Sequence, residues 1–442
     1  MAACRPRAAL LVLLAVCVAC ASGRLAAARP DSDLAAAAAA GPLVRLVGRF
    51  FPGDNGAGGA LPQLFTWSGA SASVAFEGAT SVTVSFDGRM SSLPKEHEQT
   101  RAVKKDSTFP WGFFQFELDG VKVGVGEITA SKPQLKWKLI VSPGPHVLTI
   151  TKLSEARYGA AWLQSIALPA GGRFLPPPPS PGMLSGRGML FLGDSFTAGW
   201  GNTEGRSCKG ADAHNMNTLL AYSGLTARHF NADAQILAWS GTGLLTYAKR
   251  YQTSWPQWKV EAAAPLGTQF LLRADALSPS SRYNLAAFQP QVVVLAMGTN
   301  DFLEKAGTRN NRAPPYGLPN LKAWTDGYLA VARENWTDGY LAVARELRRA
   351  YPSAAIINLV WPLEQLTAGV LTREQATKYQ QWMAAAFARL QFAGVGNVHL
   401  LQLSGAGLDS RSWCGAHPDV AAHALLAPQL ESFVRGILPS WK

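Results

Sequence analysis

A Pro-rich stretch at 171–187, with four consecutive prolines at 176–179, divides this chain into two parts with different hydrophobic patterns. Before it, polar and apolar residues alternate with the period of two that is typical of strands exposed on one face. The alternating segments are 81–86, 114–118, 121–125, 135–139 and 146–150. The dipeptide Asp119-Gly120 separates two of them and predicts a hairpin turn. We therefore expect an all-β sandwich or jelly-roll domain over residues 43–170, followed by a Pro-rich linker.

After the prolines, apolar segments of strand length alternate with longer segments of helical period. The predicted strands are 189–192, 236–239, 292–297 and 354–360, and the clearest predicted helices are 219–230, 372–392 and 418–437. Strands that are apolar throughout are buried on both faces, which is typical of a parallel sheet covered by helices. Residues 188–442 are therefore expected to form an α/β domain. In such domains the functional groups gather at the carboxyl ends of the strands.

The first residues predict export from the cell. Arg5 and Arg7 precede an apolar run that ends in small residues at 19–21, which is the pattern of a secretory signal peptide over 1–23. An uncleaved membrane anchor is the alternative interpretation. An Ala-rich flexible lead follows at 24–42, and no later segment is long and apolar enough to span a bilayer. We expect the mature protein to be secreted or to reside in the lumen of the secretory pathway.

Two cysteines remain after the predicted signal peptide, Cys208 and Cys414. Cysteines in an oxidising compartment often pair, so we expect a disulfide, with two buried free thiols as the alternative. The formal net charge of +12 is compatible with anionic partners, but a contribution to solubility is the favoured interpretation. No dense Lys/Arg block with interleaved aromatic residues indicates nucleic-acid binding, and no Cys/His or carboxylate cluster at ligand spacing indicates a metal. We expect no cofactor.

Four short motifs lie at predicted strand ends or before the last predicted helix. In chain order they are G-D-S-F with Ser195, S-G-T-G with Gly241, G-T-N-D with Asn300, and C-G-A-H-P with His417. A serine hydroxyl needs a base to take its proton, and imidazole is suited to that task. The oxyanion of acyl transfer needs donors, which the backbone N–H groups of Ser195 and Gly241 and the amide of Asn300 can supply. Each motif alone is typical of a turn or helix cap, but together they predict a serine hydrolase.

These motifs resemble the four sequence blocks of the SGNH, or GDSL-type, hydrolases. The resemblance implies a flavodoxin-like three-layer fold and ester hydrolysis with Ser195 as nucleophile and His417 as base. The β region, which begins V-R-L-V-G-R-F and contains F-T-W-S-G and T-K-L-S-E, resembles carbohydrate esterase family two. Members of that subfamily are acetyl esterases with an N-terminal jelly roll, active on acetylated plant polysaccharides. The resemblance therefore implies a polysaccharide deacetylase that works through an acyl-enzyme.

The histidine motif departs from the family pattern. Many members have an aspartate three residues before the histidine, where this chain has Cys414, and others have it two residues before, where this chain has Gly415. We therefore expect a Ser–His dyad in which a backbone carbonyl accepts the second ring N–H. Asp409, reaching from further away, is the alternative orienting acid. His423, in the predicted final helix, is a competing base for which a structural role is favoured.

Aromatic faces stack on sugar rings, so the tryptophans near the site are candidate substrate contacts: Trp200, Trp361 and Trp413. The expected partner is an acetylated polysaccharide or oligosaccharide. We expect a monomer that binds no nucleic acid and does not insert stably into a membrane. A lipid or general GDSL-type ester hydrolase is the first alternative, with residues 259–290 as a lid or acyl channel. A non-catalytic glycan-binding protein is the second.

Two local features remain outside this scheme. The segment 91–107 is rich in charged residues and predicts an exposed insertion. The sequence W-T-D-G-Y-L-A-V-A-R-E occurs at 324–334 and again at 336–346. A shift of twelve residues rotates a helix by roughly 120°, so both copies cannot face the same core. We expect one copy to extend a helix or to loop out, and we expect a helix to leave the glycosylation sequon at Asn335 unused.

Overall fold

The computed structural model describes residues 42–51, 59–89, 110–129, 131–205, 208, 214–245, 265–278, 280–302, 326–369 and 371–441. The predicted signal peptide, the Ala-rich lead up to residue 41 and the charged insertion at 91–107 lie outside these residues. Among the residues that are described, no helix combines the length and apolar character needed to cross a membrane.

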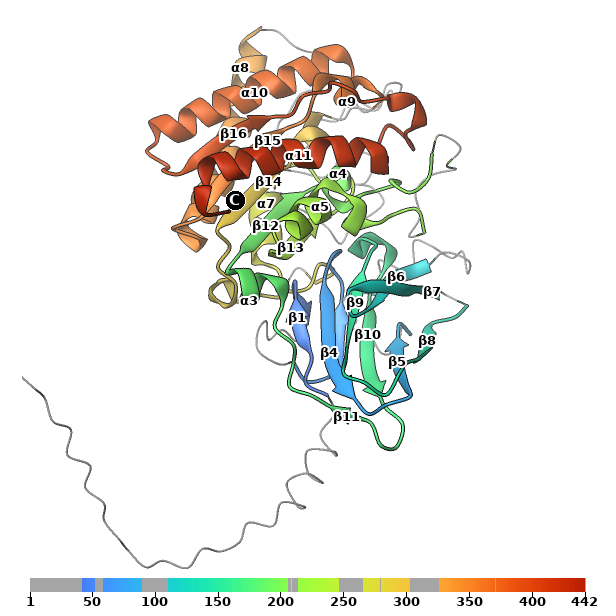
Figure 1. Cartoon of the computed structure of the whole chain (residues 1–442). Coiled ribbons are helices and arrows are strands. Elements are labelled where there is room, and N and C mark those ends of the chain that lie inside the picture. The colour runs from blue at the N-terminus through green and yellow to red at the C-terminus, as the bar shows by residue number, and fades with distance from the viewer. Residues whose placement is uncertain are drawn as a thin grey trace, which may run out of the picture. The chain divides into compact units, whose positions relative to one another are not determined.

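The five segments whose residues alternate all lie in strands, and six further strands among the described residues of the N-terminal region were not predicted (Figure 1). The strands are β1 (Arg45–Val47), β2 (Phe50–Phe51), β3 (Gln63–Phe65), β4 (Ser71–Glu77), β5 (Ser81–Asp87), β6 (Pro110–Leu118), β7 (Val121–Thr129), β8 (Gln134–Ile140), β9 (His146–Lys152), β10 (Ala161–Ala167) and β11 (Arg173–Phe174). All pairings between them are antiparallel. One sheet has the order β1-β4-β9-β6-β7, with β11 also on β4, and the other has the order β2-β3-β10-β5-β8.

The two antiparallel sheets pack face to face around an aromatic core. Phe114 on β6 contacts Phe65 and Phe86 of the opposite sheet, with ring centroids 5.7 and 4.4 Å away. The predicted hairpin is confirmed between β6 and β7. Asp119 and Gly120 form its turn with φ of 52° and 79°, the two positive values that a tight hairpin turn requires.

The C-terminal region forms a parallel sheet with helices. Its strands are β12 (Gly188–Gly193), β13 (Asp233–Ala238), β14 (Val292–Ala296), β15 (Ala355–Val360) and β16 (Val398–Gln402). Its helices are α3 (Pro181–Ser185), α4 (Ser195–Ala198), α5 (Tyr222–His229), α7 (Leu266–Leu272), α8 (Asp326–Ala350), α9 (Leu363–Thr367), α10 (Arg373–Phe392) and α11 (Val420–Ile437). Short 3₁₀ turns lie at η3 (Ala156–Tyr158), η4 (Thr218–Leu220), η6 (Leu285–Ala287), η7 (Thr299–Phe302), η9 (Ser410–Ser412) and η10 (Pro439–Trp441). The four predicted strands are confirmed, and β16 is a fifth that we did not predict.

The strand order β13-β12-β14-β15-β16, with every pair parallel, is the flavodoxin-like order 2-1-3-4-5. The connection from β12 to β13 runs one way along the sheet, and the later connections run the other way. Right-handed crossovers of opposite direction lie on opposite faces. The observed packing agrees with two groups of helices. One group contains α5 and α11, which pack against each other, and the other contains α8, which packs against α7 and α10. The carboxyl ends of β12, β13 and β14 meet at the point where the direction reverses, so the loops after them converge.

The β region is tied to the α/β region by buried contacts. The guanidinium of Arg49, which is fully buried, donates to the side chain of Gln235 at 2.8 Å and to the carbonyls of Leu271 and Arg273 at 2.7 Å each. Trp67 donates from its indole N–H to the carbonyl of Ala274 at 3.0 Å. These carbonyls at the end of α7 lack helical partners, and the β region satisfies them.

The same contacts bear on the predicted lid at 259–290. Its described part, 265–278 and 280–290, contains α7, whose Leu266, Phe270 and Leu271 are buried in the main core. This part packs against the β region through the contacts of Arg49 and Trp67. The described part of the duplicated segment, 326–346, lies in one 25-residue helix, α8, in which Trp336 and Tyr340 of the second copy are fully buried. The side chain of Asn335 lies outside the described residues.

Candidate active site

Ser195 lies where β12 turns into α4, at the carboxyl edge of the parallel sheet. Asp194 caps the helix by accepting the N–H of Phe196 at 3.0 Å. Gly193 is required at the strand end, because a Cβ there would lie 1.9 Å from the hydroxyl oxygen of Thr197. The turn is therefore tight, and it places Ser195 at the start of the helix with 6% of its surface exposed.

His417 meets this serine although the two residues are far apart in the chain. Its Nε2 lies 2.8 Å from the hydroxyl oxygen of Ser195, and its Nδ1 lies 2.9 Å from the carbonyl oxygen of Gly415. A carbonyl only accepts, so Nδ1 carries the ring proton and Nε2 is the acceptor that faces the serine proton. The arrangement has the geometry of a nucleophile next to a base whose tautomer is set by the backbone.

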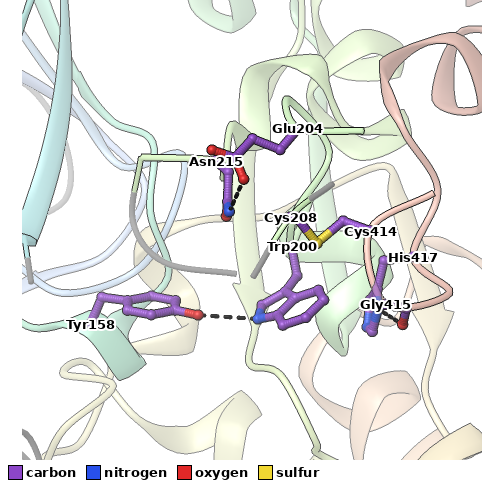
Figure 2. Close-up of a disulfide and its surroundings, with 8 residues drawn as sticks. All are labelled: Tyr158, Trp200, Glu204, Cys208, Asn215, Cys414, Gly415 and His417. Atoms are coloured by element: carbon purple, nitrogen blue, oxygen red, sulfur yellow. Dashed lines mark hydrogen bonds between the residues drawn. A yellow bond between two sulfur atoms is a disulfide. The ribbon is translucent and has the colours of Figure 1, made fainter. Parts of the chain in front are cut away.

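A tight turn presents His417 to the serine. Gly415 and Ala416 have φ of 52° and 65°, and the N–H of His417 donates to the carbonyl of Cys414 at 2.9 Å. Positive φ at both central positions is costly for alanine, so the surroundings must hold the turn. Cys414, its first residue, is joined to Cys208 by a disulfide (Figure 2). The predicted cysteine pair is thus present, and it anchors the residue that begins the turn.

Reduction of this disulfide is expected to slow catalysis. Without the bond, the turn that carries His417 has more freedom, and a loosely placed base is less effective. We expect a thiol reductant to lower kcat for an aryl acetate about tenfold at a temperature well below Tm. The Cys208→Ser/Cys414→Ser double variant should start at the lower kcat and be insensitive to the reductant. Equal kcat for the oxidised and reduced wild type would contradict this role.

Two other groups compete with this dyad in the sequence. The carboxylate of Asp409 accepts hydrogen bonds from the guanidinium and from the backbone N–H of Arg411. These bonds lower the pKa of Asp409 to about 2. His423 is fully buried, and its Nδ1 accepts the N–H of Tyr222 at 3.2 Å. Burial lowers the pKa of His423 to about 3, so this ring is neutral and structural at physiological pH.

The loops after β13 and β14 contain Gly241 and Asn300, the two residues predicted as oxyanion donors beside Ser195. Gly241 follows β13 with φ of 81°, a conformation that favours glycine. The amide of Asn300, in η7 after β14, donates to the carbonyl of Thr242 at 3.0 Å and to the carboxylate of Asp194 at 3.2 Å. Asn300 therefore links all three strand-end loops. We missed the part played by Asp194, although it stands next to Ser195 in the G-D-S-F motif.

Asp194 is buried, with 1% of its surface exposed. Burial raises the pKa of its carboxyl to about 6, against the opposing effect of hydrogen bonds such as the one from the Thr299 hydroxyl at 2.6 Å. Since its oxygens accept from Phe196, the residue after Ser195, and from η7, Asp194 holds these elements together.

Within the residues described above, no three His, Cys, Asp or Glu side chains gather where they could hold a metal ion.

The three candidate tryptophans differ in their surroundings. Trp200 is half-buried and its ring lies 4.2 Å from that of His417, while its indole N–H donates to the hydroxyl of Tyr158 at 3.1 Å (Figure 2). Trp361 is fully buried, edge-on to Phe196 at 5.0 Å. It has no face on which a sugar could stack, which contradicts our expectation for this residue. Trp413 is 4% exposed, which leaves it little such surface.

Sequence reasoning also missed the part of the β region that reaches this site. Tyr158 in η3 contacts Trp200, and Glu155, immediately before η3, accepts the N–H of Ser240 at 2.6 Å. Glu155 is the last residue of the T-K-L-S-E segment that carries part of the subfamily resemblance, and Tyr158 follows three residues later. That segment was the available signal, but the sequence does not say which loop of the other region it contacts.

Comparisons with known proteins agree with this architecture. Cellulase/esterase CelE of Acetivibrio thermocellus is 26% identical over 415 residues, which are 92% of this chain and 40% of that protein. An acetylxylan esterase / glucomannan deacetylase of Cellvibrio japonicus is 33% identical over 170 residues, which are 37% of this chain and 41% of that protein. The chain thus spans about two fifths of the length of these relatives.

Solved structures share the fold over about nine tenths of this chain. A family two carbohydrate esterase from Clostridium thermocellum, in complex with cellohexaose, covers 90% of this chain and 100% of its own with a TM-score of 0.65 and 21% identity. A family two carbohydrate esterase from Cellvibrio japonicus has a TM-score of 0.64 and 21% identity. The match covers 91% of this chain and 98% of that structure. The model of the GDSL-like Lipase/Acylhydrolase family matches residues 191–425, from the strand before Ser195 to the helix after His417. With this match over more than half of its length, the chain belongs to the GDSL-like lipase/acylhydrolase family.

Proposed function

We propose that this protein is a secreted serine esterase that removes O-acetyl groups from cell-wall-type polysaccharides. The observation that carries the proposal is the 2.8 Å contact between the hydroxyl of Ser195 and Nε2 of His417, at the carboxyl edge of the sheet. The similarity to carbohydrate esterases and to an acetylxylan esterase supports the substrate class. The N-terminal signal pattern supports export, and the two packed antiparallel sheets support a jelly roll.

The proposed reaction has two steps. In the first, Nε2 of His417 takes the hydroxyl proton as the oxygen of Ser195 attacks the acetyl carbonyl carbon. The N–H groups of Ser195 and Gly241 stabilise the negative oxygen of the tetrahedral intermediate. The amide of Asn300 also donates to this oxygen, and for this one of its two N–H groups turns away from Thr242 or Asp194. As the intermediate collapses, the protonated imidazole gives its proton to the departing sugar oxygen, and an acetyl-enzyme remains.

In the second step a water molecule attacks the acetyl-enzyme. His417 accepts a proton from the water, the new tetrahedral intermediate releases the oxygen of Ser195, and that oxygen takes the proton back from the imidazole. The products are acetate and the regenerated serine. The carbonyl of Gly415 stabilises the imidazolium in both steps, because it accepts the Nδ1–H that keeps the ring in place.

The alternative of a lipid esterase uses the same chemistry. It is less well supported, because α7 in the segment 259–290 is buried between the two regions. A half-buried tryptophan beside the catalytic histidine, Trp200, favours a sugar ring close to the scissile ester.

The proposal is tested by measuring acetate release from a panel of acetylated glycans, together with hydrolysis of aryl acetate and long-chain aryl esters. We expect acetate from at least one acetylated polysaccharide and a strong preference for the aryl acetate. Ser195→Ala should lower kcat by about 10⁴-fold or more. A preference for long acyl chains would favour the lipid esterase. Unchanged acetate release by Ser195→Ala would end the assignment, and glycan binding without hydrolysis in the wild type would indicate a binding protein.

A further inference from the structure

A carboxylate of the β region reaches the loop that carries Gly241. Glu155 lies between β9 and η3, and it is fully buried. One of its oxygens, Oε2, accepts the backbone N–H of Ser240 at 2.6 Å, across 85 residues of sequence. The contact joins the two regions of the fold at the residue directly before a predicted oxyanion donor.

The position of Ser240 makes this contact significant for Gly241. The next peptide group along the chain contains the N–H of Gly241, and its direction depends on the rotation of the Ser240 backbone. Fixing the N–H of Ser240 holds the plane of the peptide group before it, and this plane is the base from which φ and ψ of Ser240 set that direction. The φ of 81° at Gly241 then turns the chain back, so that the N–H of Thr242 donates to the carbonyl of Trp239 at 3.2 Å.

The rest of the loop is held by residues of the α/β region itself. The carbonyl of Thr242 accepts from Asn300, and the N–H groups of Leu244 and Leu245 donate to the carboxylate of Asp301 at 2.8 and 3.2 Å. These contacts hold the far side of the loop. Glu155 holds the near side, before Gly241.

Glu155 is itself held by one residue of each region. Its backbone N–H donates to the sulfur of Met216 at 3.1 Å, and its carbonyl accepts from the ammonium of Lys152 at 3.2 Å. Burial raises the pKa of the Glu155 carboxyl, and the charges of Arg157 and Lys152 act in the opposite direction. Burying a carboxylate costs desolvation free energy, and here the buried group contacts the oxyanion loop. This contact is therefore unlike a solvent-exposed contact between two regions.

We propose that Glu155 is a positioning residue for the oxyanion hole: through the N–H of Ser240 it sets the direction of the N–H of Gly241. The inference rests on the proposed esterase function. It assigns the β region a part in the chemical step, because one side of the oxyanion loop is held from that region.

The decisive comparison is between Glu155→Ala and Glu155→Gln. The alanine variant leaves the N–H of Ser240 without its acceptor, and we expect kcat for an aryl acetate to fall about 10- to 100-fold with KM changed less than about twofold. The glutamine variant keeps an oxygen that can accept the N–H, so its kcat should stay within about threefold of wild type. Glu431→Ala is the matched control, because Glu431 is also buried but contacts His229 on α5.

Hydrogen–deuterium exchange of peptides covering 236–245 supplies a readout that needs no substrate. Exchange at residues 240–242 should be faster in Glu155→Ala and unchanged in Glu155→Gln and Glu431→Ala. Should Glu155→Ala fail to fold, Glu155→Asp carries the same test, with a smaller loss of kcat expected from its shorter side chain.

Three results would overturn the inference: wild-type kcat in the alanine or aspartate variant, an equal loss in the glutamine variant, or unchanged exchange at 240–242. A wild type that hydrolyses no ester would refute the proposed function instead. The exchange experiment would still report whether Glu155 holds the loop.

Discussion

Replacing His417 by alanine is expected to lower kcat for an aryl acetate about 10⁴-fold, with little change in KM. The hydroxyl of Ser195 then has no base at 2.8 Å, and its own acidity is far too low to supply an alkoxide at neutral pH. The substrate still binds, because the imidazole acts mainly on the proton of the nucleophile. Steady-state kinetics of the purified variant, with Tm as a check on folding, provide the measurement.

Asp409→Asn is the control that separates a dyad from a triad. Asp409 hydrogen-bonds to Arg411, and Nδ1 of His417 hydrogen-bonds to the carbonyl of Gly415. We therefore expect this variant to keep kcat within about twofold of wild type, since its carboxylate has no part in orienting the imidazole. A loss in Asp409→Asn close to that in His417→Ala would show that the acid acts on the histidine after all.

Replacing Asn300 by aspartate is the second change with a large expected effect. It removes an oxyanion donor, which alone typically costs about 10²- to 10³-fold in kcat. It also turns two donating contacts into repulsive ones, because the new carboxylate faces the carboxylate of Asp194 and the carbonyl of Thr242. We expect kcat to fall about 10³-fold or more, since a negative group beside the site opposes the developing oxyanion.

The comparison of Asn300→Asp with Asn300→Ala isolates the contribution of charge. The alanine variant loses the donor without gaining a carboxylate, so its kcat should lie between those of the aspartate variant and the wild type. Asn284→Asp is the matched control, because Asn284 caps the short turn η6 through its side-chain oxygen, which aspartate retains. The control Asn284→Asp should keep wild-type kcat. If Asn300→Asp also keeps wild-type kcat, Asn300 is not an oxyanion donor.

Much of the architecture could be predicted from local patterns. The alternation at 114–118 and 121–125 around Asp119-Gly120 predicted β6, β7 and their turn, because strand period and turn chemistry act over a few neighbouring residues. Four of the strands of the parallel sheet were predicted from apolar runs. The strand β16 was missed, since its residues are half-buried or exposed at the sheet edge and lack a continuous apolar run with buried neighbours.

The site could be predicted in part. Ser195 and His417 were identified because each stands in a motif whose residue types suit one step of the chemistry. Trp361 was misjudged, because proximity in sequence to a strand end does not reveal that Phe196 and Tyr222 cover the ring. The carbonyl of Gly415 was expected only as some backbone carbonyl, since every residue carries one.

The sequence alone therefore predicted most of the secondary structure, the proposed nucleophile and base, and the cysteines that form the disulfide. Only the tertiary structure decided which groups orient that machinery: the contact from Glu155 to Ser240 and that from Tyr158 to Trp200. The reason is physical. Periodicity, caps and turns depend on interactions within a few residues, whereas these contacts join segments that meet only when the β region packs against the parallel sheet.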